Sequence, residues 1–219
     1  AIDTREWAHT IYAVEGEDLA LIGTSEHALL GMHAGKTFAL KDLPRRYFSY
    51  SMCFRKEVGS HGINEKGLWR THQFNKIEQF VFCTPEESAY YFDELLRNTE
   101  DILKKLGLHY RVLEICSGDL SLWKQRSYDL EVWRPTTEDW GEIVSLSNCT
   151  DYQARKLGIK LERDGTREVV HTLNNTALAT SRILVAILEN FQTSKGTIKI
   201  PKMLWPYMYG SKEMGKRQK

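Results

Sequence analysis

Charged side chains flank a short glycine-containing segment in the first third of the chain. Phe54-Arg55-Lys56-Glu57 ends one apolar stretch, and Arg70 to Glu78 (RTHQFNKIE) begins the next. The intervening segment, Val58 to Gly67, has the length of a hairpin loop. Two arginines beside carboxylates suit a ligand that carries both phosphate and ammonium groups. Spacing alone favours the alternative, in which these charges form ion pairs across the surface of a hairpin.

Three later features also carry polar groups that could bind a ligand. Arg182 is a lone cation beside the apolar run Ile183 to Leu188, and a buried arginine needs an anionic or stacked partner. We therefore expect Arg182 to contact a ligand. Glu142 and Ser145 lie either side of Ile143 and Val144 and could offer hard oxygen ligands to Mg²⁺, although an exposed glutamate at a strand edge is the simpler interpretation. Asn174-Asn175-Thr176 precedes an apolar stretch and indicates a helix N-cap.

The hydrophobic pattern predicts an α+β fold in which helices pack on an antiparallel sheet. The clearest helix begins at Thr84-Pro85, with Thr84 as N-cap, and ends before Gly107. Further helices are expected from about Thr176 to Phe191 and from Thr24 to Met32. Strands are expected at Leu19 to Gly23, Tyr47 to Arg55, Thr71 to Cys83, His109 to Cys116, Ser127 to Trp133 and Gly141 to Ser147.

Composition, charge and the absence of common motifs exclude several classes of protein. The 219 residues suit one domain, and 30 basic against 29 acidic residues give a net charge of +1, which excludes a polybasic nucleic-acid binder. The chain contains no P-loop, GxGxxG, HExxH or GxSxG motif. No apolar run is long enough to span a membrane, and the first residues do not form a signal peptide. The four separate cysteines are expected to be free thiols, and we expect a cytoplasmic protein without membrane partners.

Several segments together resemble the class II aminoacyl-tRNA synthetases, and within them the seryl-tRNA synthetase family of the archaeal and eukaryal-cytosolic branch. Phe54 to Glu57 with Arg70 to Phe74 resembles motif 2, and Ala177 to Asn190 resembles motif 3. Five stretches that carry the resemblance to the seryl enzymes occur in the family's order. They are Thr24-Ser25-Glu26, VGSHG (58–62), HQFNKIEQF (72–80), SNCTDYQAR (147–155) and LNNTALATSR (173–182). The resemblance covers about Ile11 to Tyr207 and implies the class II fold, an antiparallel sheet flanked by helices.

The resemblance implies a two-step reaction. Serine and ATP would form seryl-adenylate, and the seryl group would pass to the acceptor end of tRNA(Ser). Arg55 and Arg182 would be the catalytic cations, which stabilise charge on the phosphates as preorganised groups do. The implied ATP site comprises Arg55, Lys56, Glu57, Arg70, Phe74, Glu142, Ile143, Val144, Ser145 and Arg182, with Phe74 stacked under adenine and Glu142 and Ser145 holding Mg²⁺. The implied serine site comprises Thr24, Ser25, Glu26, Arg55, Glu78, Asn174 and Thr176.

Two parts of the family's architecture are missing from this sequence. The N-terminal coiled coil that grips tRNA would show sustained heptads, and motif 1, which forms the family's homodimer interface, would precede Tyr12. Residues 1–219 are therefore expected to be the C-terminal part of a synthetase catalytic domain. Two alternatives remain. One is a truncated paralogue that activates or binds serine and charges something other than tRNA, such as a carrier protein, and the other is a non-catalytic remnant.

Overall fold

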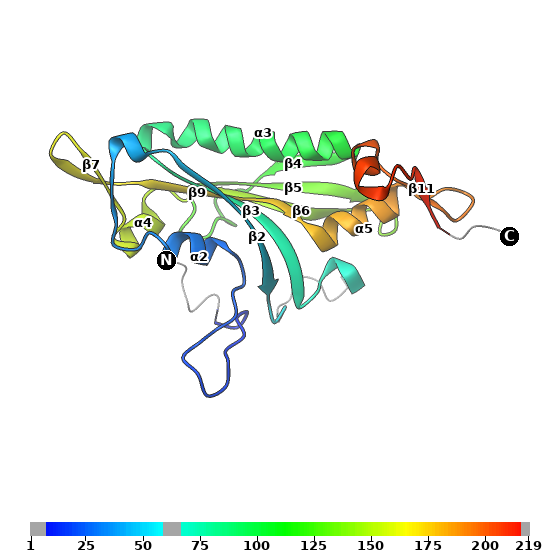
Figure 1. Cartoon of the computed structure of the whole chain (residues 1–219), viewed down its shortest axis with the longest axis horizontal. Coiled ribbons are helices and arrows are strands. Elements are labelled where there is room, and N and C mark those ends of the chain that lie inside the picture. The colour runs from blue at the N-terminus through cyan, green and yellow to red at the C-terminus, as the bar shows by residue number, and fades with distance from the viewer. Residues whose placement is uncertain (1–7, 59–66, 216–219) are drawn as a thin grey trace.

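A six-stranded sheet in the order β2-β3-β9-β6-β5-β4 forms the centre of the molecule (Figure 1). The computed structural model describes residues 8–58 and 67–215. Every neighbouring pair in this sheet is antiparallel, as the sequence predicts. Its strands are β2 (Arg45–Phe54), β3 (Gln73–Cys83), β4 (Tyr110–Glu114), β5 (Arg126–Arg134), β6 (Asp139–Asn148) and β9 (His171–Ala179).

Smaller elements surround the central sheet. A three-stranded sheet pairs β1 with β7 in parallel and β7 with β8 antiparallel, and β10 pairs with β11 near the C-terminus. The strands are β1 (Thr37–Ala39), β7 (Lys160–Arg163), β8 (Thr166–Val169), β10 (Ile198–Lys199) and β11 (Glu213–Met214). The α-helices are α2 (Glu26–Gly31), α3 (Ser88–Leu106), α4 (Tyr152–Leu157) and α5 (Thr180–Asn190). Short 3₁₀ helices occupy Leu40–Asp42, Gly67–Trp69, Pro85–Glu87 and Lys202–Met208.

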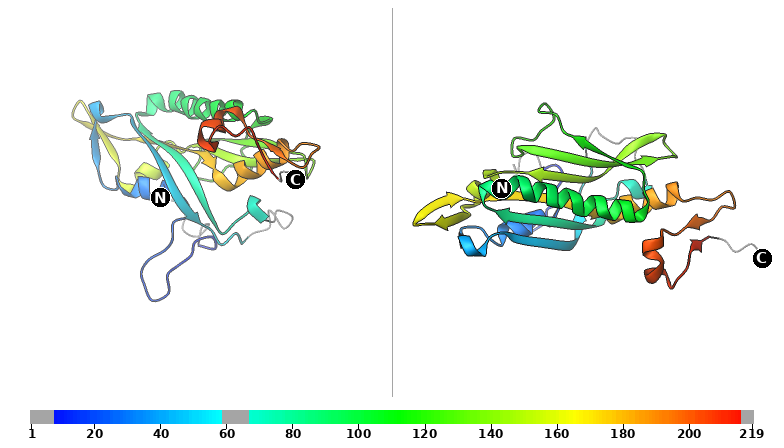
Figure 2. Two further views of the ribbon diagram at one scale, coloured as in Figure 1. Left: turned by 45° about the vertical axis from the view of Figure 1, so that its right-hand side comes forward. Right: turned by 90° about the horizontal axis from the view of Figure 1, so that it is seen from above.

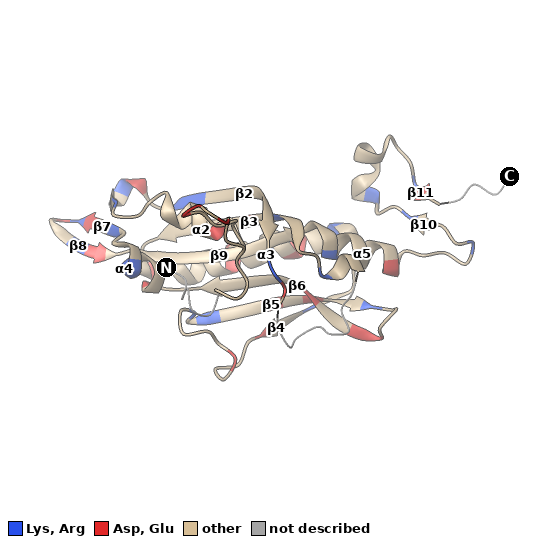
Figure 3. Cartoon of the chain, turned by 90° about the horizontal axis from the view of Figure 1, so that it is seen from below, with Lys and Arg blue, Asp and Glu red and all other residues tan. Residues whose placement is uncertain are grey.

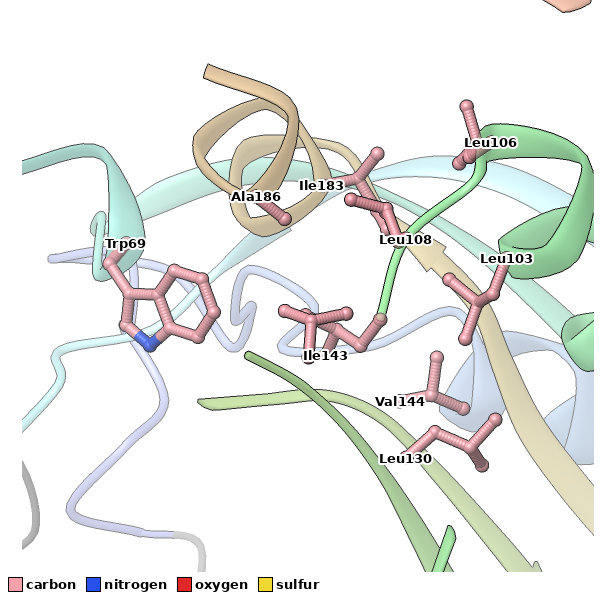
Figure 4. Packing of buried hydrophobic residues seen from close by; sticks show 10 residues of the cluster. Trp69, Leu103, Leu106, Leu108, Leu130, Ile143, Val144, Ile183 and Ala186 are labelled. Carbon is pink, nitrogen blue, oxygen red and sulfur yellow. The ribbon is translucent and has the colours of Figure 1, made fainter. Parts of the chain in front are cut away.

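Helix α3 covers one face of the sheet along its length (Figure 2). Its apolar side packs on strands β3, β5, β6 and β9, and α5 closes this core at one end (Figure 4). Leu103 and Leu106 of α3 meet Leu130 of β5 and Val144 of β6, and all four are almost fully buried. The alternation of side chains along β3 sends Val81 toward this core.

In the described part of the chain, an apolar core covers one end of the opposite face of the sheet. There α2, α4 and the strands β1 and β7 pack on Phe80 and Phe82 of β3. Phe74, Lys76 and Glu78 share the side of β3 that carries these two phenylalanines, because side chains alternate with a period of two. Farther along β3, this face therefore presents polar side chains instead of an apolar core.

Most of the predicted elements are confirmed, with ends that differ by a few residues. Gly107 ends α3 with φ of 71°, in the left-handed region that glycine adopts without cost. The four cysteines are free, as expected. Among the described residues, no helix is long and apolar enough to cross a membrane. Charged residues of both signs lie along the whole length of the molecule (Figure 3).

Three predictions about local structure are wrong. Leu19 to Gly23 is not a strand, since only an isolated bridge between Ala13 and Ala20 forms there. Thr84 does not cap α3, because its hydroxyl bonds to Glu87 Oε2 at 2.9 Å and Pro85 opens a 3₁₀ turn ahead of the helix.

The third error concerns Asn174-Asn175-Thr176, which lie in β9 and not at a helix N-cap. Strand β9 is flanked by β3 and β6, so its backbone groups bond across the sheet and α5 begins only at Thr180. The buried amide nitrogen of Asn175 donates to Leu95 O and Thr99 Oγ1, both at 2.8 Å, while its Oδ1 has no hydrogen-bond partner within the described part of the chain. The polar residues of this segment therefore led the sequence analysis to miss a central strand, β9.

Candidate active site

A cavity of about 270 Å³ opens beside the polar part of β3. Segments that are distant in sequence meet there: the end of β2, the 3₁₀ helix Gly67–Trp69, β3, β6, β9 and the start of α5. Nine of the residues predicted from sequence line it: Arg55, Glu57, Arg70, Phe74, Glu142, Ile143, Ser145, Thr176 and Arg182. Three arginines make this cavity suited to an anionic ligand.

Arg55 is held at the point where β2 ends. Its backbone N–H donates to His72 O at 2.9 Å, which continues the pairing of β2 with β3 by one residue. Its Nε donates to Gly23 O at 3.0 Å, and its guanidinium carbon lies 5.4 Å from the centre of the Phe74 ring. These contacts orient the guanidinium group at the cavity before any ligand arrives.

Glu57 and Arg70 form an ion pair across the base of the segment that joins β2 to β3. Both side chains are largely buried, and Glu57 has a φ of 50°, which is uncommon for a residue with a side chain. The ion pair that the sequence allowed across the hairpin is therefore present, and the same two residues line the cavity.

Arg182 lies in the first turn of α5 and reaches across to β6. Its Nη1 donates to the backbone oxygen of Glu142 at 2.7 Å and lies 3.6 Å from the Glu142 carboxylate. The guanidinium carbon also lies 5.7 Å from the centre of the Trp69 ring. Protein groups thus supply Arg182 with an anionic and a stacked partner, while the side chain keeps 22% of its surface exposed.

Glu142 and Ser145 supply two oxygen donors at the cavity wall, and β5 adds Asp129 opposite Ser145. Burial, with a smaller contribution from Glu142, raises the pKa of Asp129 to about 6. Within residues 8–58 and 67–215, no group of three or more histidines, cysteines or carboxylates forms a metal cage. One carboxylate with one hydroxyl fits Mg²⁺ that is shared with a phosphate ligand, since this ion keeps few protein ligands.

A buried polar network lies behind the cavity. Lys76 Nζ donates to Thr24 Oγ1 at 2.7 Å and forms an ion pair with Glu78. Thr176, which lines the cavity and pairs with Glu78 across the strands, donates to Glu78 Oε2 at 3.4 Å. This network therefore offers a cation, a carboxylate and hydroxyls to a small polar ligand next to the anion site.

Glu26 is the most perturbed acid of this network. Its Oε1 accepts hydrogen bonds from Gln153 Nε2 at 2.5 Å and from Asn174 Nδ2 at 3.1 Å. Burial, followed by the nearby charge of Glu78, raises the pKa of Glu26 to about 7, while the bond from Gln153 and the charge of Lys76 oppose this shift. A bound ammonium group would favour the ionised form.

Seven predicted residues do not line the cavity. Four of them, Thr24, Glu26, Glu78 and Asn174, belong to the buried network behind it. Lys56 lies 5.8 Å from the centre of the Tyr12 ring, and Val144 belongs to the core under α3. Ser25 is buried behind the site, and its hydroxyl has no hydrogen-bond partner within the described part of the chain. Most of the VGSHG motif (59–62) lies outside the described residues.

Sequence reasoning missed five residues of the cavity wall: Trp69, Thr71, Lys76, Ala179 and Ser181. Lys76 could have been found, because it shares the period of two with Phe74 and Glu78 on β3. Trp69 lies in a 3₁₀ turn without periodicity, so nothing in its surroundings indicates its position.

The sequence was compared with models of known protein families. Residues 10–191 match the model of the tRNA synthetase class II core domain (G, H, P, S and T). This chain belongs to that class II core family. Its fold, an antiparallel sheet with flanking helices, is the one expected from the sequence.

Relatives within the family are serine–tRNA ligases. The ligase of Korarchaeum cryptofilum is 52% identical over 207 residues, which are 94% of this chain and 45% of that protein. The ligase of Pyrococcus abyssi is also 52% identical, over 95% of this chain and 46% of its own length. The chain thus spans about half the length of the curated relatives that it matches.

Solved structures of seryl-tRNA synthetases are also similar to this chain. The seryl-tRNA synthetase of Pyrococcus horikoshii complexed with ATP superposes with a TM-score of 0.93 at 49% identity, covering 98% of this chain and 48% of that one. The cytoplasmic serine–tRNA ligase of Naegleria fowleri in complex with AMP gives 0.92 at 41% identity, covering 99% and 52%. These archaeal and eukaryotic relatives agree with the branch indicated by the sequence motifs.

Proposed function

We propose that this chain is the catalytic-core portion of a serine–tRNA ligase, which activates L-serine with ATP and transfers it to the acceptor end of tRNA(Ser). The observation that carries the proposal is the junction of two sites at one cavity. Arg55, Arg70 and Arg182 surround an anion site, and the network of Thr24, Lys76 and Glu78 adjoins it. The ATP and AMP complexes of the related structures support the nucleotide assignment.

ATP would occupy the cavity with its phosphates among the arginines. Phe74 would stack on adenine, Glu57 would accept a hydrogen bond from the adenine amino group, and Arg182 would contact the γ-phosphate. Ile143 would line the nucleotide site, whereas Lys56 and Val144 would contribute less directly, since neither of them lines the cavity. Glu142 and Ser145 would hold Mg²⁺, which neutralises phosphate charge in such reactions.

Serine would bind in the adjoining network. Its ammonium group would pair with Glu26, its hydroxyl would bond to Glu78 and Thr176, and its carboxylate would face Arg55. Ser25 and Asn174 would shape this site from behind. Alanine could not form the hydrogen bonds that the serine hydroxyl would make with the buried Glu78 and the half-buried Thr176, and a site built to bind a hydroxyl rejects the analogue that lacks it.

Chemistry at this site needs no covalent intermediate on the protein. The serine carboxylate would attack the α-phosphorus in line and release pyrophosphate, with Arg55 stabilising the charge that develops on the phosphate oxygens. The hydroxyl of the terminal tRNA adenosine would then attack the seryl carbonyl and release AMP. We propose a cytoplasmic protein that is homodimeric in its full-length form, with residues 1–219 as one catalytic unit.

A serine-dependent ATP–pyrophosphate exchange assay tests the proposal. We expect exchange with L-serine and none with L-alanine, and charging of tRNA(Ser) in a parallel assay. Exchange without charging would instead support a synthetase-like protein that activates serine for another acceptor. A well-folded chain that gives no exchange would contradict both.

A further inference from the structure

Gln153 of α4 lies at the centre of the buried network around Glu26, although it does not line the cavity. Its side chain is completely buried, which is rare for an amide unless every polar atom is paired. Its Nε2 donates to Glu26 Oε1 at 2.5 Å, and its Oε1 accepts from Thr172 Oγ1 at 2.7 Å. One side chain thus connects α4 to β9 and to the start of α2.

The bond from Thr172 determines which way the amide faces. A hydroxyl that donates to Gln153 Oε1 leaves the NH₂ group directed at Glu26, so the amide can only act as a donor to that carboxylate. Thr172 is itself fully buried in β9 and is therefore fixed by the sheet.

Both side-chain hydrogen bonds that the described part of the chain makes to Glu26 end on Oε1. Asn174 supplies the second, at 3.1 Å, and the backbone N–H of Glu26 bonds to Thr24 Oγ1 at 3.3 Å. The carboxylate is therefore fixed through one oxygen, while Oε2 stays available for a donor that arrives with a ligand.

We propose that Gln153 is a positioning residue for amino-acid recognition: it orients the Glu26 carboxylate to receive the ammonium group of serine and favours the ionised form of that carboxylate. This inference rests on the proposed function, because it assigns that ammonium group to Glu26. Gln153 acts through Glu26 and touches no substrate itself.

The charged groups around Glu26 act on its ionisation in both directions. Glu78 on β3 opposes ionisation, whereas Lys76 on β3 and Lys124 in the loop before β5 favour it, and the buried thiol of Cys149 lies nearby. Burial destabilises the charged carboxylate more than these cations stabilise it, so the N–H donor of Gln153 adds to the groups that favour the ionised form.

Gln153→Met tests the proposal, because methionine keeps the volume and removes the donor. We expect serine-dependent exchange with KM for serine raised about tenfold or more and KM for ATP unchanged, since a hydrogen bond to a charged group is lost. The acid limb of the pH profile of kcat/KM for serine should move to higher pH, because Glu26 loses a bond that favours its ionised form.

Asn175→Leu is the matched control. Asn175 is an equally buried amide on β9, but it bonds to α3 through Leu95 and Thr99. We expect it to lower the melting temperature and leave KM for serine and the pH profile unchanged. Thr172→Val, which frees the amide of Gln153 to turn, should change KM in the same direction as Gln153→Met by a smaller factor, and it carries the test if Gln153→Met does not fold.

The outcomes separate this inference from the proposed function. If the wild-type chain exchanges with serine, and Gln153→Met or Thr172→Val keeps both KM for serine and the pH profile, the positioning role is wrong and the proposed function stands. If the folded wild-type chain neither exchanges nor binds serine by calorimetry, both are wrong.

Discussion

The indole ring of Trp69 occupies the space that a side chain at position 141 would need. A Cβ at Gly141 would lie 2.3 Å from Trp69 Cζ2 and 2.8 Å from Arg134 Cδ, and real Cβ atoms do not approach so closely. Arg134 in turn stacks on Trp69 at 4.0 Å and pairs with Glu189 of α5 at 2.9 Å. Glycine on β6 therefore allows the tryptophan that supports Arg182 at the cavity.

Gly141→Ala should disturb this contact. We expect a loss of about 1–3 kcal/mol in the free energy of unfolding, because the buried indole must shift, together with weaker ATP binding through Arg182. Urea denaturation and calorimetric titration with ATP would measure the two effects. Gly31→Ala is the control, since position 31 is exposed in α2 with nothing within 4 Å, and it should be neutral or stabilise by about 0.5–1 kcal/mol. Equal stabilities of both variants would contradict this account.

Arg182→Ala should remove activity while the fold persists. We expect exchange to fall by about 100-fold or more, because a preorganised cation on the phosphates is lost. Its partly exposed ion pair with Glu142 contributes little to stability, so the melting temperature should change slightly. Arg155→Ala, at an exposed pair on α4, should leave exchange unchanged. Unfolding of Arg182→Ala with unaltered activity per folded molecule would make Arg182 structural.

The buried pair of Lys76 and Glu78 should respond differently from exposed pairs. Lys76→Met leaves Glu78 buried without its cation, and we expect a loss of about 3–5 kcal/mol in stability. The double variant Lys76→Met/Glu78→Gln should regain part of this loss, because no buried charge remains. Lys104→Met, at an exposed pair on α3, should cost less than about 1 kcal/mol. Chemical denaturation of the four proteins completes the comparison.

Stability should fall as pH rises where Glu26 titrates. The pKa of this carboxyl is about 7 in the folded chain and 4.5 when unperturbed, so the folded state binds the extra proton between these values. The free energy of unfolding should therefore decrease from pH 4.5 to 7 and then level off, by an amount of the order of 3 kcal/mol. His27, whose pKa falls to about 4 on burial, acts in the opposite direction below pH 6.5.

The variant Glu26→Gln isolates the contribution of Glu26, because His27 and the other groups titrate in both proteins. The wild-type stability minus that of Glu26→Gln should decline between pH 4.5 and 7 and stay constant above pH 7. A difference that rises with pH over this interval would show that Glu26 is ionised in the folded chain at lower pH.

The predictability of the site depended on how each residue is positioned. Arg55, Glu57 and Arg70 stand at the ends of two alternating strands, so their types and spacing were enough to place them together. Arg182 was identifiable as a cation beside an apolar run. Each of these residues could be identified from its neighbours in sequence, and in the fold each forms an ion pair or a stacked contact.

Strand β9 shows what local signals could not supply. Its segment HTLNNTALA carries buried amides that bond to α3, α2 and the loop after β6, so its polarity reflects partners that are remote in sequence. The pattern favoured a helix cap, and only the resemblance to a family assigned Thr176 to a ligand. Gln153 was hidden for the same reason, because its partners Glu26 and Thr172 belong to other elements.

The place of β9 between β3 and β6 also governs when the site can form during folding. The cavity needs residues from Arg55 through Arg182, and β3 pairs with a strand that emerges about ninety residues later. Contacts between residues so far apart in sequence slow folding, because the chain loses the entropy of closing a large loop before the stabilising contacts form. A nascent chain would therefore form the complete cavity only after β9 and the start of α5 have been synthesised and β9 has entered the sheet.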